Sequence, residues 1–410
     1  MAEILFIAHR IPFPPDRGDK IRSHHILRRL AALAPVHVAC FADNPADLAH
    51  EPALAAMAAS HCLVARSRPL PLAGLAALGQ GRPVSLTAFA DARLRAYVAH
   101  IVATRPIAAI YVFSGQMGQY VPPAFAGRVV IDLVDVDSLK FGAYAAAATG
   151  PRRWLYAREE RLLRAEEARL VARADRTLLV SPEEQALLGP RLPAGLAGKV
   201  GAIGNGIDTT LYDPDRVTPA AALAEQPGPA LIFTGQMDYP PNVAAVVRGA
   251  RRIMPAIRAV HPEATFEIVG RQPAAAVRAL DGINGCRVRG AVDDIRPWLR
   301  GADLALVPLE IARGIQNKVL EAMAMALPVV ASTGAATGIP VRPGEELAVA
   351  DSDAAMIAAT LALLADRAAA RAMGLAARRC VVATHGWDAV LAPLAATLGL
   401  AGGEGLPDAA

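Results

Sequence analysis

Lysine is scarce in this chain of 410 residues. Among 42 basic residues only Lys20, Lys140, Lys199 and Lys318 are lysines, and the others are arginines. Because a composition rich in alanine and arginine commonly reflects coding bias, single arginines carry little information, whereas the four lysines are worth following. The formal net charge of +4 is mild and no basic run alternates with aromatic residues, so we expect no nucleic-acid partner.

Cysteine is also rare, and long apolar runs are missing. The four cysteines, Cys40, Cys62, Cys286 and Cys380, have no C-x-x-C spacing, which predicts free thiols in a reducing compartment and no metal site. The longest apolar stretch falls short of the roughly 20 residues that a membrane span needs. We therefore expect a cytoplasmic protein, with peripheral contact at the inner membrane face as an open alternative.

Three common signatures are absent as well. No G-x-x-x-x-G-K-[ST] occurs, which disfavours P-loop hydrolysis. No G-x-G-x-x-G follows the first apolar run at 4–8, which disfavours a dinucleotide oxidoreductase. G-x-S-x-G is missing too, which weakens a hydrolase interpretation.

Short apolar runs alternate with longer helical patterns along the whole chain. In the first half the expected strands are 4–8, 36–41, 62–65, 107–113, 129–134, 177–180 and 200–203. In the second half they are 231–234, 266–269, 287–289, 304–307, 329–331 and 347–349. This alternation predicts the α/β class, with two facing, doubly wound, Rossmann-like sheets that bind ligands at the carboxyl ends of their strands.

Turn-forming clusters between residues 208 and 228 predict the domain boundary. We expect an N-terminal domain at 1–210, a C-terminal domain at 228–384 and a flexible tail at 401–410, since the tail is rich in glycine. A chain of this length buries two full cores.

The segment 308–331 is the most informative one, since it predicts strand, polar loop, helix and strand. Gly314 loosens the loop, and Asn317 is the expected N-cap of a helix that starts near Lys318 and stops before Pro328. Free N–H groups at such a helix start, with the charge of Lys318 beside them, suit a phosphate group. The alternative is an ordinary helix start in which Lys318 pairs with Glu321.

The loop 12–20 leaves the carboxyl end of the first strand. Its prolines stiffen it, Gly18 permits close backbone approach, and Lys20 opens the next helix. If the two sheets face each other, this loop and the Lys318 helix could clamp a diphosphate. The alternative is a rigid loop with solvated charges.

Acidic residues follow the strand at 129–134. Asp135 and Asp137 are the better candidates for a cleft, whereas Asp132 lies within the strand and on its other face. These carboxylates could hold sugar hydroxyls or a cation, or could simply cap the following helix. The stretch 154–173 holds more arginines than glutamates, so it could touch anionic lipid or form a solvated, salt-bridged helix.

Several motifs carry a family resemblance. They include I-G-N-G-I-D at 203–208, F-T-G-Q-M-D-Y-P-P-N at 233–242, P-P-D-R-G-D-K-I-R-S at 14–23 and R-G-I-Q-N-K at 313–318. With these motifs the sequence resembles, nearly end to end, a retaining glycosyltransferase of family 4 with the GT-B fold. The motifs at 14–23 and 313–318 are similar to those of the sugar transferases found with exosortase (PEP-CTERM) exopolysaccharide systems.

This resemblance implies transfer of a sugar, with retention, from a nucleotide-diphosphate sugar to the hydroxyl of a sugar or lipid-linked acceptor. It implies neither a cofactor nor a metal, and it implies that 385–400 crosses back onto the first domain. Two further interpretations stay open: a sugar-nucleotide epimerase on the same fold, and an inactive scaffold that binds a sugar nucleotide.

The sequence departs from the family at one important position. The family carries E-x7-E at the donor site; Glu321 matches the second glutamate, but Arg313 stands at the first. The expected donor-binding residues are Gly18, Lys20, Gly235, Gln236, Gln316, Asn317, Lys318 and Glu321. The expected catalytic residues are Asp135, Asp137 and Arg313.

Overall fold

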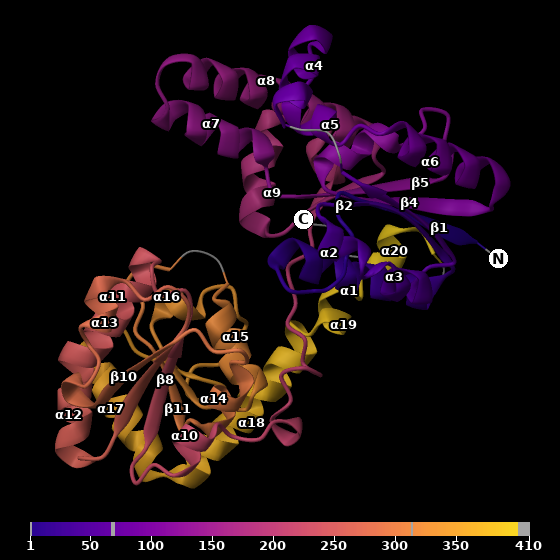
Figure 1. The fold of residues 1–410 in the computed structure, drawn as a ribbon. Coiled ribbons are helices and arrows are strands. Elements are labelled where there is room, and N and C mark those ends of the chain that lie inside the picture. Colours follow the sequence, from indigo (N-terminus) through magenta and orange to yellow (C-terminus); the bar gives the residue numbers. More distant parts are fainter. Residues whose placement is uncertain (1, 67–69, 313–314, 401–410) are drawn as a thin grey trace. The chain divides into compact units, whose positions relative to one another are not determined.

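The computed structural model spans the chain, and the structure describes residues 2–66, 70–312 and 315–400. The predicted tail at 401–410 lies outside the described residues. The chain divides into two compact units (Figure 1): unit 1 is Met1–Asn205 with Val390–Ala410, and unit 2 is Gly206–Ala389. The predicted limits at 210 and 385 lie within a few residues of these divisions, and the residues between 208 and 228 belong to unit 2.

Unit 1 is built on a parallel seven-stranded sheet with the strand order β3-β2-β1-β4-β5-β6-β7. Its strands are β1 (Glu3–Ala8), β2 (Val36–Ala42), β3 (Ser60–Ala65), β4 (Ile107–Phe113), β5 (Arg128–Val134), β6 (Arg176–Leu179) and β7 (Val200–Ala202). All seven lie where the apolar runs predict them. Every residue of β1 and β2 is buried, because helices cover both faces of the sheet.

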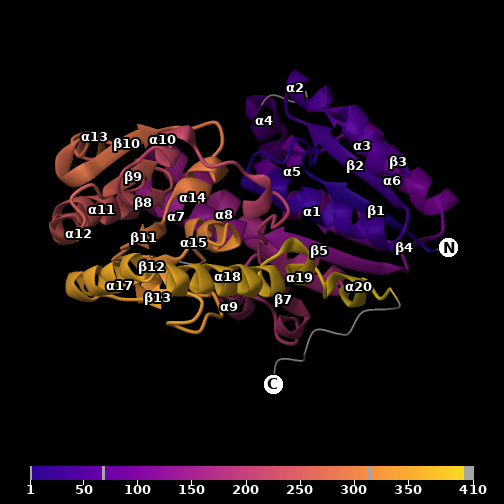
Figure 2. The same cartoon turned by 90° about the horizontal axis from the view of Figure 1, so that it is seen from below.

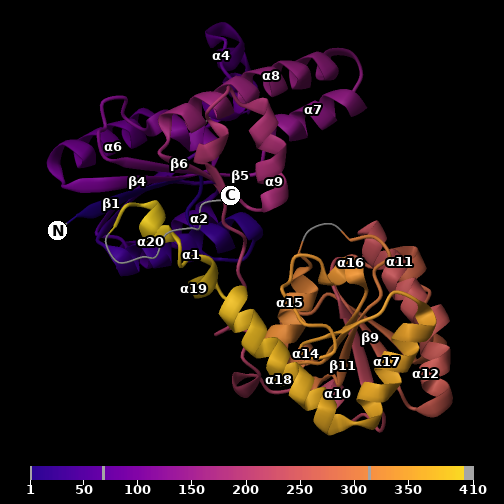
Figure 3. The ribbon, with the colours of Figure 1, turned by 180° about the vertical axis from the view of Figure 1, so that it is seen from behind.

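The helices of unit 1 form a layer on each face of this sheet. They are α1 (Gly18–Leu33), α2 (Pro45–Leu48), α3 (Glu51–Met57), α4 (Leu70–Gln80), α5 (Val84–Ala88), α6 (Ala92–Thr104), the 3₁₀ helix η1 (Gly115–Tyr120), α7 (Asp137–Ala147), α8 (Gly150–Arg173), α9 (Pro182–Leu188) and α20 (Leu394–Thr397). Helices α1 and α20 lie on one face, and α6 and α8 lie on the other (Figures 1 and 3). The returning C-terminal segment therefore completes the α1 layer.

Unit 2 repeats the plan with a six-stranded parallel sheet in the order β10-β9-β8-β11-β12-β13. Its strands are β8 (Ala230–Thr234), β9 (Thr265–Val269), β10 (Cys286–Gly290), β11 (Leu304–Val307), β12 (Val329–Ala331) and β13 (Ala348–Val349). These six strands also match the predicted positions. In both units the order reverses beside the first strand of the sheet, between β1 and β4 and between β8 and β11.

The helices of unit 2 are α10 (Ala221–Ala224), α11 (Pro240–Arg248), α12 (Met254–Val260), α13 (Ala275–Arg278), α14 (Arg296–Gly301), α15 (Asn317–Ala324), α16 (Thr333–Ala336), α17 (Asp353–Ala365) and α18 (Arg367–Thr384), followed by α19 (Trp387–Val390) at the division between the units. Figure 2 shows α17 leading into α18 along one side of unit 2. Helix α18 packs on α15, whereas α17 packs on α12.

Each unit has its own hydrophobic core. The core of unit 1 includes Leu5 and Val112, and the core of unit 2 includes Ile232 and Leu306, all of them fully buried. Aliphatic side chains from the strands fill both cores, which is typical of parallel sheets covered on both faces.

Candidate functional site

The carboxyl edge of the unit 2 sheet gathers polar side chains at the point where the strand order reverses. The loop after β8 supplies Gly235 and Gln236, and the loop after β11 leads to Lys318 on α15. Ligands of open α/β sheets bind outside the carboxyl ends of the strands at this reversal. The topology therefore brings together the predicted donor-binding residues of unit 2.

Helix α15 begins one residue earlier than predicted. Gln316 is its N-cap, in extended conformation and without a side-chain capping bond, and Asn317 is the first helical residue and is exposed. The N–H of Val319 donates to the carbonyl of Gln316 at 2.9 Å, so the amides of Asn317 and Lys318 precede the hydrogen-bonded part of the helix. This uncapped start is suited to an anion, since the partial positive charge of a helix lies at its N-terminus.

Lys318 turns back across this helix start. Its Nζ donates to Oδ1 of Asn242 at 3.0 Å and to Oε1 of Gln316 at 3.3 Å, and it lies 5.3 Å from the centre of the Phe233 ring. Within the described residues these two hydrogen bonds use two of the three ammonium donors. Burial lowers the pKa of Lys318 to about 8, while the nearby Glu321 carboxylate opposes this shift. An anion that replaced the lost hydration would reverse it.

The backbone conformation and the close neighbours of Gly235 both require glycine at this position. Its φ of +152° favours glycine, and a Cβ there would lie 2.8 Å from Nδ2 of Asn242 and 3.3 Å from Cε of Lys318. The Asn242 amide is buried, and its Nδ2 donates to the carbonyl of Gln236 at 2.9 Å. Asn242 therefore ties the β8 loop to Lys318, while the side chain of Gln236 is left exposed.

Glu321 lies one turn after Lys318 and is mostly buried. It shares a hydrogen bond with the hydroxyl of Tyr212, and burial raises its pKa to about 7 in spite of that bond and of Lys318. In the described residues the Lys318 ammonium donates to Asn242 and Gln316, while Glu321 is hydrogen-bonded to Tyr212, so the Lys318–Glu321 contact is not a simple salt bridge. Glu321 is a carboxyl group poised between its two protonation states near neutral pH.

No feature of the sequence predicts Tyr212 as a site residue, and only the motif at 233–242 points to Asn242. Tyr212 lies in the linker-like stretch after the I-G-N-G-I-D motif, and nothing in its neighbours marks it as a partner of Glu321. Asn242 follows two prolines at the start of α11, within the F-T-G-Q-M-D-Y-P-P-N motif. Its amide accepts from Lys318 at 3.0 Å, and this contact depends on folding alone.

Lys20 has a different role from the predicted one. It is buried, and its Nζ donates to Oδ1 of Asp47 at 2.7 Å and to the carbonyl of Phe13 at 3.1 Å. A lysine that holds a buried carboxylate and a carbonyl is not free to bind a diphosphate, so Lys20 stabilises unit 1 instead. Gly18 is the exposed first residue of α1, and a Cβ there would meet no atom within 4 Å, so the protein itself imposes no need for glycine at that position.

Asp135 and Asp137 follow the end of β5 and are half-buried. Both accept hydrogen bonds from Nζ of Lys140, at 2.7 Å and 3.3 Å. Neither caps α7, whose N-cap is Val136. The third acid, Asp132, is fully buried and accepts from the guanidinium of Arg22 at 2.9 Å and from the hydroxyl of Tyr111 at 2.8 Å.

Arg313 and Gly314 lie outside the described residues. Among the described residues, the carboxyl edge of the unit 2 sheet carries a polar cleft at the ends of β11, β12 and β13. This cleft is lined by Arg248, Arg252, Leu309, Glu310, Ser332, Gly334, Asp351, Ser352 and Asp353. Glu310 is the described carboxylate nearest in sequence to the departure from E-x7-E, and its side chain is more than half exposed.

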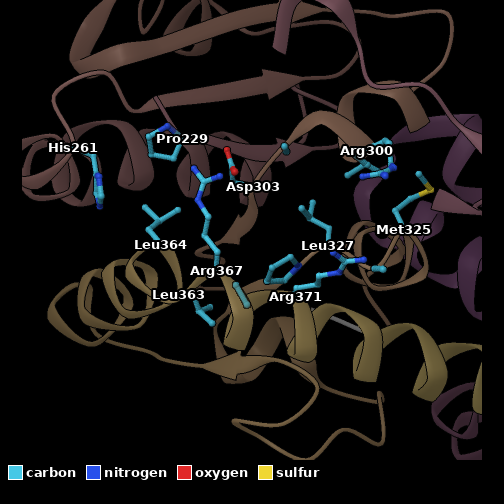
Figure 4. A pocket seen from close by; sticks show the side chains of 15 residues that line it. Pro229, His261, Arg300, Asp303, Met325, Leu327, Leu363, Leu364, Arg367 and Arg371 are labelled. Atoms are coloured by element: carbon cyan, nitrogen blue, oxygen red, sulfur yellow. The ribbon is translucent and has the colours of Figure 1, made fainter. Parts of the chain in front are cut away.

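A second cavity of unit 2 lies at the opposite edge of the sheet (Figure 4). Pro229, Asp303 and Pro328 precede the strands β8, β11 and β12, and Arg367 and Arg371 of α18 line the same cavity. It opens at the amino ends of the strands, so it is separate from the Lys318 site. Among the described residues no group of three or more His, Cys, Asp or Glu side chains gathers as a metal centre would require.

Comparisons with known proteins bear on the family and the fold of this chain. Residues 228–366, most of unit 2, match the family described as "Glycosyl transferases group 1". No curated protein matches the chain significantly.

Solved structures match the chain over nearly its whole length. They include Anabaena HepE (Alr3699) in complex with UDP, at a TM-score of 0.60 and 17% identity, covering 97% of this chain and 99% of that one. Sucrose-phosphate synthase from Thermosynechococcus elongatus matches at a TM-score of 0.59 and 20% identity, covering 95% and 96%. WaaG, a glycosyltransferase involved in lipopolysaccharide biosynthesis, matches at a TM-score of 0.54 and 16% identity, covering 98% and 100%.

The likeness to these structures shows the fold. It is GT-B, with two Rossmann-like α/β domains, so the predicted fold class is confirmed. The family match over unit 2, together with this fold, supports a glycosyltransferase.

Proposed function

We propose that this protein transfers a sugar from a nucleotide-diphosphate sugar to an acceptor hydroxyl, and that the Lys318 site of unit 2 binds the diphosphate. One observation carries the proposal: an ammonium group and an uncapped helix start lie together where the strand order of the unit 2 sheet reverses. Both groups favour negative charge, and this position in an open α/β sheet is the usual one for a nucleotide ligand.

The comparisons support the same ligand class. HepE of Anabaena is described in complexes with UDP and with UDP-glucose, and it shares the fold over the full chain. WaaG, which shares it too, is described as a glycosyltransferase of lipopolysaccharide biosynthesis. By analogy we propose a nucleoside diphosphate as the product of this protein, and exopolysaccharide or glycolipid assembly, in an exosortase-linked system, as its setting.

In this reaction the bond from the sugar's anomeric carbon to the diphosphate breaks, and a bond to the acceptor oxygen forms as the acceptor hydroxyl gives up its proton. The leaving diphosphate gains negative charge during this step. Lys318 and the amides of Asn317 and Lys318 would stabilise that charge, because they are fixed donors at a partly buried site. We propose on this basis that the reaction needs no metal ion, and the resemblance to family 4 is our reason for proposing retention.

The remaining predicted residues take narrower roles in the proposal. Glu321, held by Tyr212, would accept hydrogen bonds from the ribose hydroxyls of the donor. Gly235 would let the β8 loop approach the phosphates. Asp135 and Asp137 of unit 1, with Arg313, stay candidates for groups that meet the sugar or the acceptor.

The test is steady-state kinetics of Lys318→Ala with a sugar nucleotide identified by a thermal-shift screen. We expect the KM for the donor to rise at least tenfold, or transfer to be lost, because the site loses its full positive charge. Lys199→Ala is the matched control, since Lys199 only donates to backbone carbonyls of Ala172 and Ala174 in unit 1. Unchanged donor kinetics in Lys318→Ala would refute the assignment of this site.

The products distinguish the proposal from its two alternatives. Release of nucleoside diphosphate only when acceptor is present indicates transfer. A change of the donor sugar without acceptor would indicate an epimerase, and donor binding without turnover across many acceptors would indicate a scaffold. The anomeric configuration of the product, measured by NMR, tests retention, and full activity in the presence of a chelator tests metal independence.

A further inference from the structure

Large apolar side chains are exposed together on three helices of unit 1. They are Leu72, Leu75 and Leu78 of α4, Tyr144 of α7, and Trp154 and Leu155 of α8. Elsewhere in the described residues the exposed large apolar side chains are spread over many elements. A single exposed leucine is ordinary, but a gathered set marks a binding surface.

Helix α4 exposes its large apolar side chains and buries its small ones, which is the opposite of what a helix facing water does. Its buried side chains are the small ones, Ala73 and Ala77, while Leu72, Leu75 and Leu78 are 58%, 68% and 45% exposed. Between Leu70 and Gln80 the helix carries no charged residue. A helix with its leucines outward and no charge gains free energy when something apolar covers it.

The hairpin of α7 and α8 has a similar tip. Trp154 is 60% exposed, one turn from the start of α8, and Tyr144 is exposed on α7. The Tyr144 ring lies 5.8 Å from that of Tyr156, so the aromatic side chains of the two helices form one cluster. Tryptophan and tyrosine at such positions are typical of the boundary between water and a lipid bilayer.

Carboxylates are missing from the stretches of sequence that carry these side chains. The chain has no aspartate or glutamate from residue 52 to residue 90, nor from 141 to 158, and these two stretches include α4 and the tip of the hairpin. Arg152 and Arg153 are exposed directly before Trp154. A surface that is both apolar and free of carboxylates is complementary to an apolar partner with negative charge.

The two apolar regions belong to one end of unit 1. The Arg158 guanidinium on α8 donates to the carbonyls of Ala77 and Arg82 at 2.9 Å and 3.1 Å, which ties the end of α4 to α8. Figure 1 shows α4 and the hairpin of α7 and α8 on the same side of the sheet of unit 1. We define the basic apolar surface as Leu72, Leu75, Leu78, Tyr144, Trp154 and Leu155 with Arg152 and Arg153.

We propose that the basic apolar surface docks unit 1 on a bilayer that contains anionic lipids. The leucines and Trp154 would enter the headgroup region, and the two arginines would pair with lipid phosphates, which guanidinium groups bind in a bidentate manner. No helix in the described part of the chain has the length and apolar character to cross a membrane.

The proposal specifies the partner of unit 1 and is separate from the transfer reaction. Binding to vesicles needs neither donor nor acceptor, so an inactive protein that binds vesicles would refute only the proposed function. An active protein that ignores vesicles would refute only the membrane contact.

The test is sedimentation of the full chain with vesicles, either of pure phosphatidylcholine or of equal parts phosphatidylglycerol and phosphatidylcholine. We expect binding to the anionic vesicles and at least tenfold weaker binding to the neutral ones. The double variants Trp154→Ser with Leu155→Ser, and Leu72→Ser with Leu75→Ser, should each lower the partition coefficient about tenfold or more. The pair Arg152→Gln with Arg153→Gln should do the same on anionic vesicles alone, by on the order of tenfold.

Two control variants separate this surface from general properties of the chain. Leu187→Ser removes an equally exposed leucine of unit 1 on α9. Arg367→Gln with Arg371→Gln removes two exposed charges from α18 of unit 2. Both controls should bind vesicles like the native chain. A blue shift of fluorescence on binding should disappear in Trp154→Phe, since the other two tryptophans, the half-buried Trp298 and the buried Trp387, belong to unit 2.

Three results would overturn the proposal. They are failure to bind anionic vesicles, binding that the surface variants leave unchanged, and self-association that the same variants abolish without any vesicle binding. The last result would assign the surface to a second copy of the chain, and sedimentation velocity measures it directly. Circular dichroism of each variant checks the fold, which substitutions of exposed side chains should leave intact.

Discussion

Lys318 is a charged residue held where charge is costly. It occupies the first turn of α15, where the helix dipole disfavours a cation, and burial lowers its pKa to about 8. Both costs are relieved by a bound diphosphate. A charged residue whose ionised form is disfavoured by its surroundings and favoured by a bound anion is a good candidate for a binding site.

This pKa makes donor recognition dependent on pH. The pKa of Lys318 is about 8 in the absence of ligand, and only its protonated form carries the charge that would bind the diphosphate. We therefore expect kcat/KM for the donor to fall about tenfold per pH unit above pH 8. Lys318→Arg should remove this alkaline limb, because arginine stays protonated, even if the absolute rate is lower. A limb that persists in Lys318→Arg would assign it to another group.

Glu321 predicts a dependence of stability on pH. Its pKa is raised from 4.5 to about 7 in the folded state, so the folded protein holds this proton more tightly than the unfolded chain. The resulting stability is present below pH 4.5 and is lost as the pH rises to about 7. Glutamine does not titrate, so the Glu321→Gln variant does not lose this stability. The difference in free energy of unfolding, variant minus native, should therefore increase by about 1–3 kcal/mol as the pH rises through this range, as measured by urea titration. A constant difference would contradict the assigned shift.

Gly235 predicts an effect confined to the donor. Gly235→Ala would push its Cβ against Nδ2 of Asn242 at 2.8 Å and towards Lys318. We expect a raised donor KM, with the acceptor KM unchanged, because only the β8 loop and Lys318 are displaced. Gly201→Ala is the control, since a Cβ there meets no atom within 4 Å.

At the scale of residues, the sequence predicts which side chains belong to the site better than it predicts the partners that those side chains contact. Lys318 and Glu321 are predictable as site residues, because a lysine in a first helical turn opposes the helix dipole and because Glu321 matches the second glutamate of the family's E-x7-E. The partners Asn242 and Tyr212 could not be predicted, since each is far from α15 in the sequence. The contacts of Lys20 do not favour its predicted role as a donor ligand, and sequence alone does not reveal that Asp47 lies 2.7 Å away in the folded protein.

At the scale of elements, one buried ion pair joins four parts of unit 1. Arg22 of α1 donates to Asp132 of β5 and to the carbonyl of Gly204 after β7, and Tyr111 of β4 donates to the same carboxylate. Arg22 is 1% exposed and Asp132 is fully buried. Such a pair fixes the helix against the sheet, and each partner depends on the other for its charge to be tolerated.

Breaking this pair should therefore be costly. Arg22→Met leaves the Asp132 carboxylate buried and unpaired, and we expect a loss of about 3–5 kcal/mol in the free energy of unfolding. Arg169→Ala is the matched control, because Arg169 pairs with Glu166 on the exposed face of α8, where a pair contributes roughly 0–1 kcal/mol. The double variant Arg22→Met with Asp132→Leu should recover part of the loss, which a merely additive effect would not allow.

The elements themselves were predictable, because their signals are local. Buried parallel strands are short, apolar and rich in β-branched residues, and all thirteen predicted runs became strands. The start of α15 was predicted one residue late, since Asn317 is a better cap by type than Gln316. The outward leucines of α4 were not predicted, because an uncharged apolar helix has no pattern that indicates which face is covered.

At the scale of the whole molecule, two separate cores predict two responses to ligand. The core around Ile232 and Leu306 belongs to unit 2, and the core around Leu5 and Val112 belongs to unit 1. A nucleoside diphosphate at the Lys318 site binds the folded form of unit 2 and stabilises it by mass action, by about 2.7 kcal/mol at a concentration of 100 Kd. Calorimetry should then show a rise of one unfolding transition, and that rise should vanish in Lys318→Ala. An equal rise in Lys318→Ala would place the ligand elsewhere.

The two-domain organisation was predictable from length and from the repeated alternation of strand and helix. The exact crossing points were not, because the turn-forming residues between 208 and 228 pack with unit 2 and do not form a free linker. The departure at Arg313 also stays unassigned by contacts, since it lies outside the described residues.

The return of the chain to unit 1 has a consequence for biosynthesis. Leu394 and Leu398 are buried with unit 1, and the carbonyl of Thr397 accepts from Arg128 at 2.7 Å. A ribosome makes the chain from its N-terminus, so these residues emerge only after all of unit 2. The first unit to be translated is thus the last to be completed, and it keeps an uncovered apolar site for as long as unit 2 is being made.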